Sequence, residues 1–439
     1  MKNFIKKMTA SALAVMIFFL SSCYTSQIIS FPTDLNTYIG ENDIEASREY
    51  VLFAKGIDRA SMYNAKNDIS YLMDLGLIEH YYGNYAESSE LLLEAERLIW
   101  EAYTKSVSEG FKAFGLMNPY QAEYPGEDFE NVYVNIFSAL NFYHTGDLEK
   151  ALIEVRKVNE KLQYMNTEYE NDYRKQMARQ NNTLSGKIEY YTNSALARYL
   201  GVLFWRAADN MDSARIDAIG LNEAFAAAPH LYRHPVPPEM VMRGETCDEL
   251  SIPAGMARLN FLSFTGLSPL KTHLSSGSGI EDNRVGLVLR QAQADRIEVV
   301  FDSRQRVTLS LLEPLDVITQ QMFETREKYR QAVWFIREYT SVYSTALLSA
   351  ATLGIYRGKS DTRKNTGLDL RQSQLMPGKA YVGAVNLTPG TYSFTINYYS
   401  GNNLIDSRRI ENQTVTAGGI NLIQDYCLKF DESQTGWHD

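Results

Sequence analysis

The residue with the clearest chemistry in this sequence is Cys23, because the residues before it are those of a lipid-attachment site. Cys23 ends the run Leu20-Ser21-Ser22-Cys23, and small residues directly before a cysteine fit the processing site of bacterial lipoproteins. A peptidase would cut before Cys23, whose thiol would then carry a diacylglycerol. Two acyl chains on the thiol and one on the new amino terminus would hold the protein at a membrane, since each buried methylene contributes roughly 0.8 kcal/mol.

Residues 1–22 agree with this interpretation as a lipoprotein signal peptide. They hold three lysines followed by an apolar stretch, Ala10 to Leu20, that is too short for a permanent membrane span. An ordinary secretory signal in which Cys23 merely lies near the cleavage point is the alternative. An Asp after the cysteine retains lipoproteins in the inner membrane of many diderm bacteria. Tyr24 therefore favours the outer membrane, with the protein body in the periplasm.

The two remaining cysteines, Cys247 and Cys427, form an even pair in a compartment that usually oxidises thiols. A disulfide between them would tie the middle of the chain to its end. Two unpaired buried thiols are the alternative, because a sequence does not place two side chains within bonding distance.

Residues that could bind a metal or carry out catalysis give weaker signals. His230 and His234 have a zinc-ligand spacing for a helix, but prolines flank them and no HExxH glutamate follows. The sequence holds no nucleophile elbow, Walker loop or strand-bound dinucleotide fingerprint. Asp361 and Arg363 could cap a turn and bind a partner carboxylate, or form an internal salt bridge. We expect no catalytic residue, no metal and no cofactor, and hence no enzyme.

The net negative charge of the chain argues against nucleic acid as a partner. The formal charge is −10, and removal of residues 1–22 with their three lysines lowers it to −13. An acidic chain is a poor partner for nucleic acid, so none is expected.

Helical repeats dominate residues 43–235. In the first block, Leu75-Gly76, Gly83, Tyr85 and Ala95 fall at tetratricopeptide spacing. Gly76 would let the first helix of the pair approach the second, and Gly83 would permit the turn between them. Tyr85 and Leu92 would fill the wedge between the two helices.

Two further blocks repeat this pattern. Phe137 to Leu162 has Gly146 in its turn and Ala151 at the helix contact. Ala195 to Pro229 has Gly201 on its first helix and Ala214 on its second, with Asp209-Asn210 replacing the turn glycine. The sequence therefore predicts an irregular solenoid whose concave groove would bind a partner. The candidate groove residues are Leu72, Glu79, Asn141 and Arg198.

The pattern changes after Pro235. Apolar alternation predicts strands over residues 257–264, 296–301, 307–311, 380–387, 391–399 and 421–430, and Thr388 to Thr391 predicts a hairpin turn. An uncharged stretch, residues 340–356, predicts a buried helix rather than a membrane span.

The three repeat blocks, together with later motifs, resemble a family of bacterial tetratricopeptide-containing lipoproteins. The motifs are Gly-x-x-Pro-x-Lys at Gly266 to Lys271, Ser360-Asp361-Thr362-Arg363, and Leu-x-Pro-Gly-x-Tyr at Leu387 to Tyr392. The resemblance covers residues 67–396. It implies no established catalytic activity and an envelope location, often beside lipoproteins similar to the curli channel and to penicillin-binding-protein activators.

The sequence thus predicts a mainly α protein, an irregular tetratricopeptide-like helical solenoid followed by a smaller α+β domain. Its parts would be a signal peptide (1–22), a tether (23–42), the repeats (43–235) and the α+β part (236–439). The expected function is that of a membrane-anchored, non-enzymatic scaffold that binds other envelope proteins or lipoproteins. The alternatives are an envelope hydrolase, or a small-molecule-binding lipoprotein serving a transporter with a closed pocket between the two parts.

Overall fold

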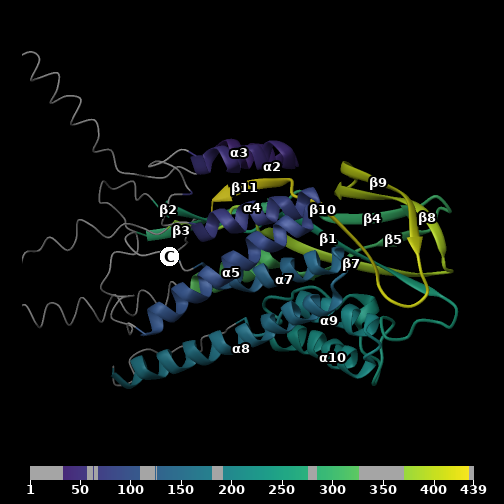
Figure 1. Ribbon diagram of the computed structural model, residues 1–439, viewed down its shortest axis with the longest axis horizontal. Helices are drawn as coiled ribbons and strands as arrows, with labels where there is room; N and C mark the ends of the chain where they lie inside the picture. The colour runs from purple at the N-terminus through teal and green to yellow at the C-terminus, as the bar shows by residue number, and fades with distance from the viewer. Residues whose placement is uncertain are drawn as a thin grey trace, which may run out of the picture.

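The computed structural model describes residues 33–56, 63, 68–108, 124, 126–179, 191–274, 284–325 and 370–434. Helices occupy the first half of this region and strands most of the second half (Figure 1). The helices are α2 Thr33–Gly40, α3 Ile44–Gly56, α4 Asp68–Tyr82, α5 Tyr85–Ser108, α7 Asp128–His144, α8 Leu148–Arg179, α9 Ala195–Ala207 and α10 Met211–Ala227. A short 3-10 turn, η2, spans Pro238–Met240, and residues 315–325 are helical.

The helices pair as hairpins, α4 with α5, α7 with α8 and α9 with α10, and left-handed residues make the turns. Gly83 has φ of 95° and Gly146 has φ of 83°, while Asp209 takes the corresponding place in the third hairpin with φ of 56°. A side chain in this region costs roughly 1–2 kcal/mol, which explains why two of the three turns use glycine.

Small residues let the helices of a pair approach each other. A Cβ added to Gly76 of α4 would lie 2.8 Å from the Leu92 side chain of α5, and Gly201 of α9 lies directly against Asp217 of α10. Ala151 and Ala214 are fully buried. The half-buried Tyr85 stacks on His144 of the next hairpin, with ring centroids 4.0 Å apart, so it joins two hairpins.

The described strands form three sheets. The first has the order β10-β1-β7-β6, with β1 parallel to β10 and antiparallel to β7. The second is β11-β3-β2 and the third is β5-β4-β8-β9, both antiparallel. Their bounds are β1 Ala257–Leu267, β2 Leu270–Leu274, β3 Arg284–Ala292, β4 Arg296–Phe301, β5 Arg306–Thr308, β6 Ser310–Glu313, β7 Pro377–Leu387, β8 Gly390–Ser400, β9 Asn403–Val415, β10 Asn421–Cys427 and β11 Phe430–Gln434.

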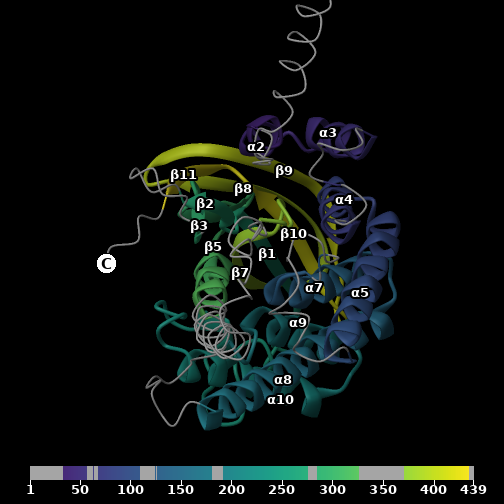
Figure 2. The ribbon, with the colours of Figure 1, turned by 90° about the vertical axis from the view of Figure 1, so that its left-hand side faces the viewer.

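Strand β1 is buried along its whole length because it lies between two layers. Its odd-numbered Leu259 and Phe261 pack with β4 and β8 of the third sheet. Its even-numbered Leu262 and Phe264 share a core with the helices. The protein is therefore built in three layers, helices, central sheet and outer sheet, and the helices curve around the sheets (Figure 2).

The predicted fold class is wrong in its balance. Among the described residues, three sheets with eleven strands fill the C-terminal region, so the protein is not mainly α and the strand-rich part is not a small appendage. The predicted order, helices first and strands afterwards, is the order observed. The sequence could not reveal that residues 43–235 and 236–439 share one hydrophobic core, because helical periodicity does not show what covers the apolar face.

Two local predictions also need correction. The turn at Pro389 joins β7 to β8, but these strands lie in different sheets, and the hairpin partner of β8 is β9. The tether predicted over residues 23–42 includes helix α2, whose Leu35 and Ile39 are buried in the core. Asn36 of α2 also donates a hydrogen bond to Glu432 of β11 at 3.1 Å.

Candidate functional site

The inner face of the helical row, formed by α4, α7 and α9, is covered by the protein's own central sheet. Phe137 of α7 lies 5.2 Å from Phe264 of β1 between ring centroids, and Tyr81 of α4 lies 4.9 Å from Tyr426 of β10. The backbone N–H of Leu422 donates to the Tyr143 hydroxyl at 3.1 Å. The concave side that the sequence predicts as an open groove is thus part of the interior.

The predicted groove residues consequently serve internal contacts. Glu79 and Asn141 are buried, at 1% and 0% exposure. Glu79 accepts hydrogen bonds from Arg48 and Asn84, at 2.5 and 2.7 Å. Leu72 is half-buried against the shared core. Arg198 is partly buried and pairs with Asp217 at 2.7 Å. The prediction that these four line an open groove is therefore corrected, since two are fully buried and the other two pack against neighbouring parts of the chain.

A polar relay joins two helices to β10. Asn141 shares a 2.5 Å hydrogen bond with His80 Nδ1, and Gln424 of β10 contacts the opposite ring nitrogen at 2.6 Å. The other end of Gln424 bonds His144 at 3.0 Å. Burial lowers the pKa of His80 to about 3, so this ring is neutral at physiological pH.

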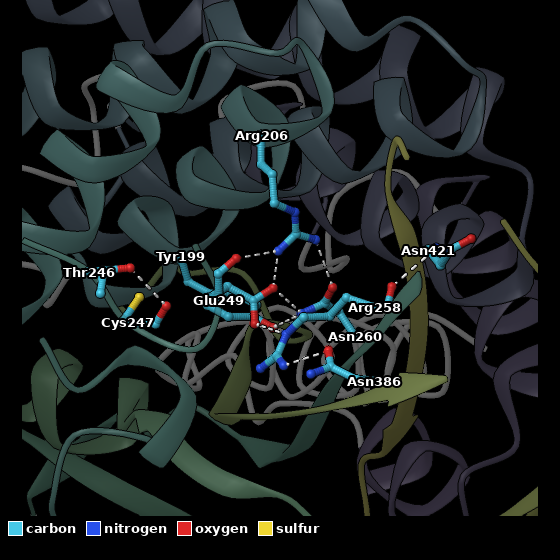
Figure 3. Close-up of polar contacts among 9 residues, drawn as sticks. All are labelled: Tyr199, Arg206, Thr246, Cys247, Glu249, Arg258, Asn260, Asn386 and Asn421. Carbon is cyan, nitrogen blue, oxygen red and sulfur yellow. Dashed lines mark hydrogen bonds and ion pairs between the residues drawn. The ribbon is translucent and has the colours of Figure 1, made fainter. Parts of the chain in front are cut away.

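A second junction centres on Glu249, which is fully buried between α9 and β1 (Figure 3). Its carboxylate accepts from Arg206, from Arg258 Nε at 2.6 Å and from Asn260 Nδ2 at 2.6 Å. Asn260 also donates to the Tyr199 hydroxyl at 3.1 Å. Two guanidiniums, an amide and a carboxylate therefore connect a helix of the third hairpin to the central strand.

The positive charges of Arg206 and Arg258 keep the Glu249 carboxyl group ionised. Burial alone would raise the pKa of Glu249, but the charges of Arg206 and Arg258 outweigh it and hold that pKa below its ordinary value. The neighbouring Glu239 lacks such a partner, and its buried Oε1 has no hydrogen-bond partner among the described residues. Burial, with the nearby charge of Glu249, raises the pKa of Glu239 to about 7.

A third junction holds the segment before β7. Asp74 of α4 accepts from Ser373 Oγ at 2.6 Å and from the Gln374 N–H at 2.7 Å, and Tyr63 donates to its other oxygen at 2.7 Å. Glu130 of α7 accepts from the Ser373 N–H at 2.5 Å. Burial raises the pKa of Asp74 to about 6 and, with the charge of Glu127, that of Glu130 to about 7.

A fourth junction centres on the buried carboxylate of Glu313 of β6, which lies at the beginning of α9. It accepts from the Leu196 N–H at 3.0 Å, from Ser194 and from the hydroxyl groups of Tyr133 and Tyr232. Burial raises its pKa. One N–H at the N-terminus of α9, that of Leu196, donates to this carboxylate, which therefore joins the central sheet to α9.

The Gly-x-x-Pro-x-Lys motif lies beside the third junction. Gly266 has φ of 58° and lies against Ala292, where an added Cβ would be 2.6 Å from the Ala292 Cα, so only glycine fits. The carbonyl of Pro269 accepts from Gln372 at 2.5 Å. Lys271 is buried and pairs with Glu127 at 2.6 Å. The motif thus positions an ion pair where helix α7 meets β2.

A small pocket lies at this point between the helices and the sheets. Its enclosed space is about 10 Å³, room for about one water molecule. The Thr319 side chain is 2% exposed, and its hydroxyl oxygen has no hydrogen-bond partner among the described residues. The pocket is lined by Glu127, Asp128, Phe129, Lys271, Leu287, Thr319, Met322, Phe323 and Gln372.

The histidines and cysteines have other roles. His230 contacts Gln321 and His234 contacts the Leu312 carbonyl, so the two rings bond to different residues. Within the described ranges no three His, Cys, Asp or Glu residues gather as metal ligands. Cys247 and Cys427 are buried free thiols in separate core clusters, so the structure contains no bond between them.

The outer face of the helical row carries exposed aromatic and acidic side chains. We use the term outer face for Glu87, Glu90, Arg97 and Trp100 of α5 with Tyr164 of α8. Trp100 is 55% and Tyr164 is 41% exposed, and their ring centroids lie 6.5 Å apart. Arg97 is bonded to Glu94 and Glu101 of its own helix, so acids outnumber bases on this surface.

Several predicted residues lie outside the described part of the chain. These are the lipidation candidate Cys23, the pair Asp361 and Arg363, and the helix predicted over residues 340–356. None of the described helices combines the length and apolar character needed to cross a bilayer.

Comparisons with protein-family models, with curated proteins and with solved structures found no match.

Sequence reasoning missed the buried carboxylates that join the layers. One signal was present, because Asp74, Glu79 and Glu130 lie within apolar stretches of their helices, and a charged residue there must find partners. Glu249 and Glu313 gave no such signal, since Glu249 lies in a turn and Glu313 lies just beyond the strand predicted over residues 307–311.

Proposed function

We propose that this chain is a lipid-anchored envelope protein that acts without catalysis and binds another envelope protein through its outer face. The anchor is the acylated Cys23, and the body faces the periplasm at the outer rather than the inner membrane. This proposal keeps the scaffold role that the sequence suggests and moves the binding surface from the inner to the outer face.

The observation that carries the proposal is the exposed pair Trp100 and Tyr164. Trp and Tyr are enriched among residues that dominate binding energy at protein interfaces, while a solvated helix face rarely needs them. Their exposure is 55% and 41%, on two different helices that an ion-pair network holds together. Glu96 of α5 bonds Lys157 and Lys161 of α8 at 3.0 and 2.8 Å, so the two rings have fixed spacing.

The charge of the outer face defines the chemistry of the partner. Glu87 and Glu90 are exposed on α5, about three turns before Trp100. A partner surface with an apolar centre for the two rings and Lys or Arg at its rim would match this surface, and opposite charges would speed association. The partner is therefore a protein with a basic rim.

Two measurements test the proposal. Radiolabelled palmitate should be incorporated into the full-length protein and be lost from Cys23→Ser. Affinity capture from crosslinked envelopes should recover a protein with the wild type that is lost with Trp100→Ala and Tyr164→Ala. Ile216→Ala is the matched control, because Ile216 is also exposed, at 62%, on the distant helix α10. Identical recovery from all three variants would contradict the proposed surface.

A further inference from the structure

Helix α3 presents two apolar side chains to solvent at its C-terminal end. Phe53 is 66% exposed and Leu52 is 41% exposed. The exposed stripe continues towards the N-terminus with Glu49 and Glu45, which lie about one and two turns away from Phe53. The face is therefore apolar at one end and acidic at the other. Helix α3 lies on the opposite side of the molecule from α10 (Figure 2).

This end of α3 is also the end from which the chain leads to Cys23. Only residues 41–43 separate α2 from α3, and the rings of Tyr38 and Tyr50 lie 6.3 Å apart, as in an antiparallel pair. Thr33 lies about 12 Å before this turn and Leu52 about 14 Å after it, at a rise of 1.5 Å per residue. The start of α2 and the apolar end of α3 therefore lie at about the same distance from the turn, at the same end of the helix pair.

The length of chain between Cys23 and Thr33 limits the distance to the membrane. Thr33 follows Cys23 by ten residues. Even a fully extended chain of this length spans at most about 36 Å. An anchor at Cys23 would keep the apolar end of α3 close to the bilayer surface at all times, at a high effective concentration.

We propose that Leu52 and Phe53 insert into the interfacial region of the bilayer that holds the acylated Cys23. The inference rests on the proposed lipid anchor and adds the orientation of the body on the membrane. The chain is acidic, so attraction to anionic lipid does not supply the contact. Apolar insertion supplies it, to a depth of about 5–10 Å, and the acids at Glu45 and Glu49 keep the rest of the helix in the headgroups or in water.

The orientation has a consequence for the rest of the molecule. With α3 on the membrane, α10 on the opposite side is directed away from it into the periplasm. The lipid anchor alone would leave the body free to rotate on its tether. A second contact at α3 would fix which surface a partner meets.

Depth-dependent quenching tests this contact. The acylated full chain carries an environment-sensitive fluorophore at Phe53→Cys or, as matched control, at Ile216→Cys, where exposure is 62%. The native Cys247 and Cys427 are buried and react slowly. Each protein is bound to vesicles of phosphatidylethanolamine and phosphatidylglycerol that carry a nitroxide near the lipid carbonyls. Vesicle flotation measures anchoring separately.

We expect both proteins to float, with a loss of at least about half the fluorescence at position 53 and little loss at position 216. Equal quenching at the two positions in floating protein would overturn the membrane contact and leave the anchor intact. Failure to float would refute the anchor and the contact together. Protection of position 53 in native envelopes but not in protein-free vesicles would assign the face to a partner protein and also overturn the inference.

Discussion

Glu249 illustrates how single buried charges hold this protein together. Its carboxylate has no exposure to solvent and is neutralised by Arg206 and Arg258. Such a site contributes little net stability compared with an apolar one, but removing one partner leaves an uncompensated charge. Its role is to fix the register between α9 and β1, because only one arrangement satisfies the two guanidiniums and Asn260 together.

Replacement of Glu249 tests that role. Glu249→Gln keeps the shape and leaves the two buried guanidiniums without a counter-charge, so we expect a loss of about 3–5 kcal/mol in the free energy of unfolding. Urea denaturation followed by circular dichroism measures it. Glu90→Gln on the outer face is the control and should change stability by less than about 0.5 kcal/mol. Equal effects would mean that the junction is not a structural requirement.

Glu239 gives a prediction of pH dependence. Burial raises its pKa to about 7, so the folded state keeps a proton that the unfolded state releases near pH 4. Because the folded state binds more protons in this window, stability is full below about pH 4 and falls as the pH rises to 7. Glu239→Gln removes this loss.

We therefore expect Glu239→Gln to be more stable than the wild type by on the order of 2 kcal/mol at pH 8, with the difference shrinking towards zero at pH 4. Denaturation curves at both pH values supply the measurement. Glu245→Gln, 91% exposed on its side chain, is the control and should show no pH-dependent difference. A constant difference at both pH values would show that Glu239 does not titrate in this window.

At the scale of single elements, the turns were the most predictable part of the fold. Gly83 and Gly146 have the positive φ that their positions in the repeat pattern require, and Asp209 adopts the same conformation where glycine is missing. Strand β4, residues 296–301, coincides with the predicted strand because its alternating residues face the core on one side only. These features depend on residues close in the sequence.

Elements whose position depends on distant residues were not predictable. Pro389-Gly390 indicates a turn, but no local signal shows that β8 leaves the sheet of β7 and pairs with β9. Strand β9 itself is largely exposed and polar, so it lacks apolar alternation. The groove residues Glu79 and Asn141 belong to helices of the expected type, yet the sequence could not show that both are buried against neighbouring helices.

Substitutions at equivalent turn positions in two hairpins should change the stability of the protein in opposite directions. Gly146→Ala forces a side chain into the left-handed region and should lower stability by roughly 1–2 kcal/mol. Asp209→Gly relieves the same strain in the third hairpin and should be neutral or slightly stabilising. Thermal unfolding of both variants is the check. A stabilising Gly146→Ala would disprove the conformational argument, because nothing lies within 4 Å of an added Cβ there.

At the scale of the whole molecule, the shared core joins parts that the sequence separates. Residues Ile78, Phe137 and Tyr199 of the helices belong to the same core as Leu262 and Phe264 of β1. Because the central sheet covers the inner face of the helical row, the outer face is the surface of that row that remains exposed to solvent. The proposed binding surface on the outer face is based on this arrangement.

The shared core predicts that helices and sheets unfold together. Native-state hydrogen exchange should give peptides from α7 and β1 the same largest opening free energy. A fragment ending at residue 236 should not fold, because its inner face would expose the core to water. Different opening free energies for the α7 and β1 peptides would show two separate domains. A fragment that circular dichroism shows to be folded would do the same.

The measurement that tests the central claim most directly compares the two faces of the helical row in living cells. A photocrosslinking amino acid replaces Arg97 on the outer face, which leaves Trp100 in place, or Asn141 on the inner face of the lipidated protein. Position 97 should give an adduct with another envelope protein, while position 141, at 0% exposure, should crosslink only within the chain. Adducts with a second protein from position 141 and none from position 97 would contradict the account.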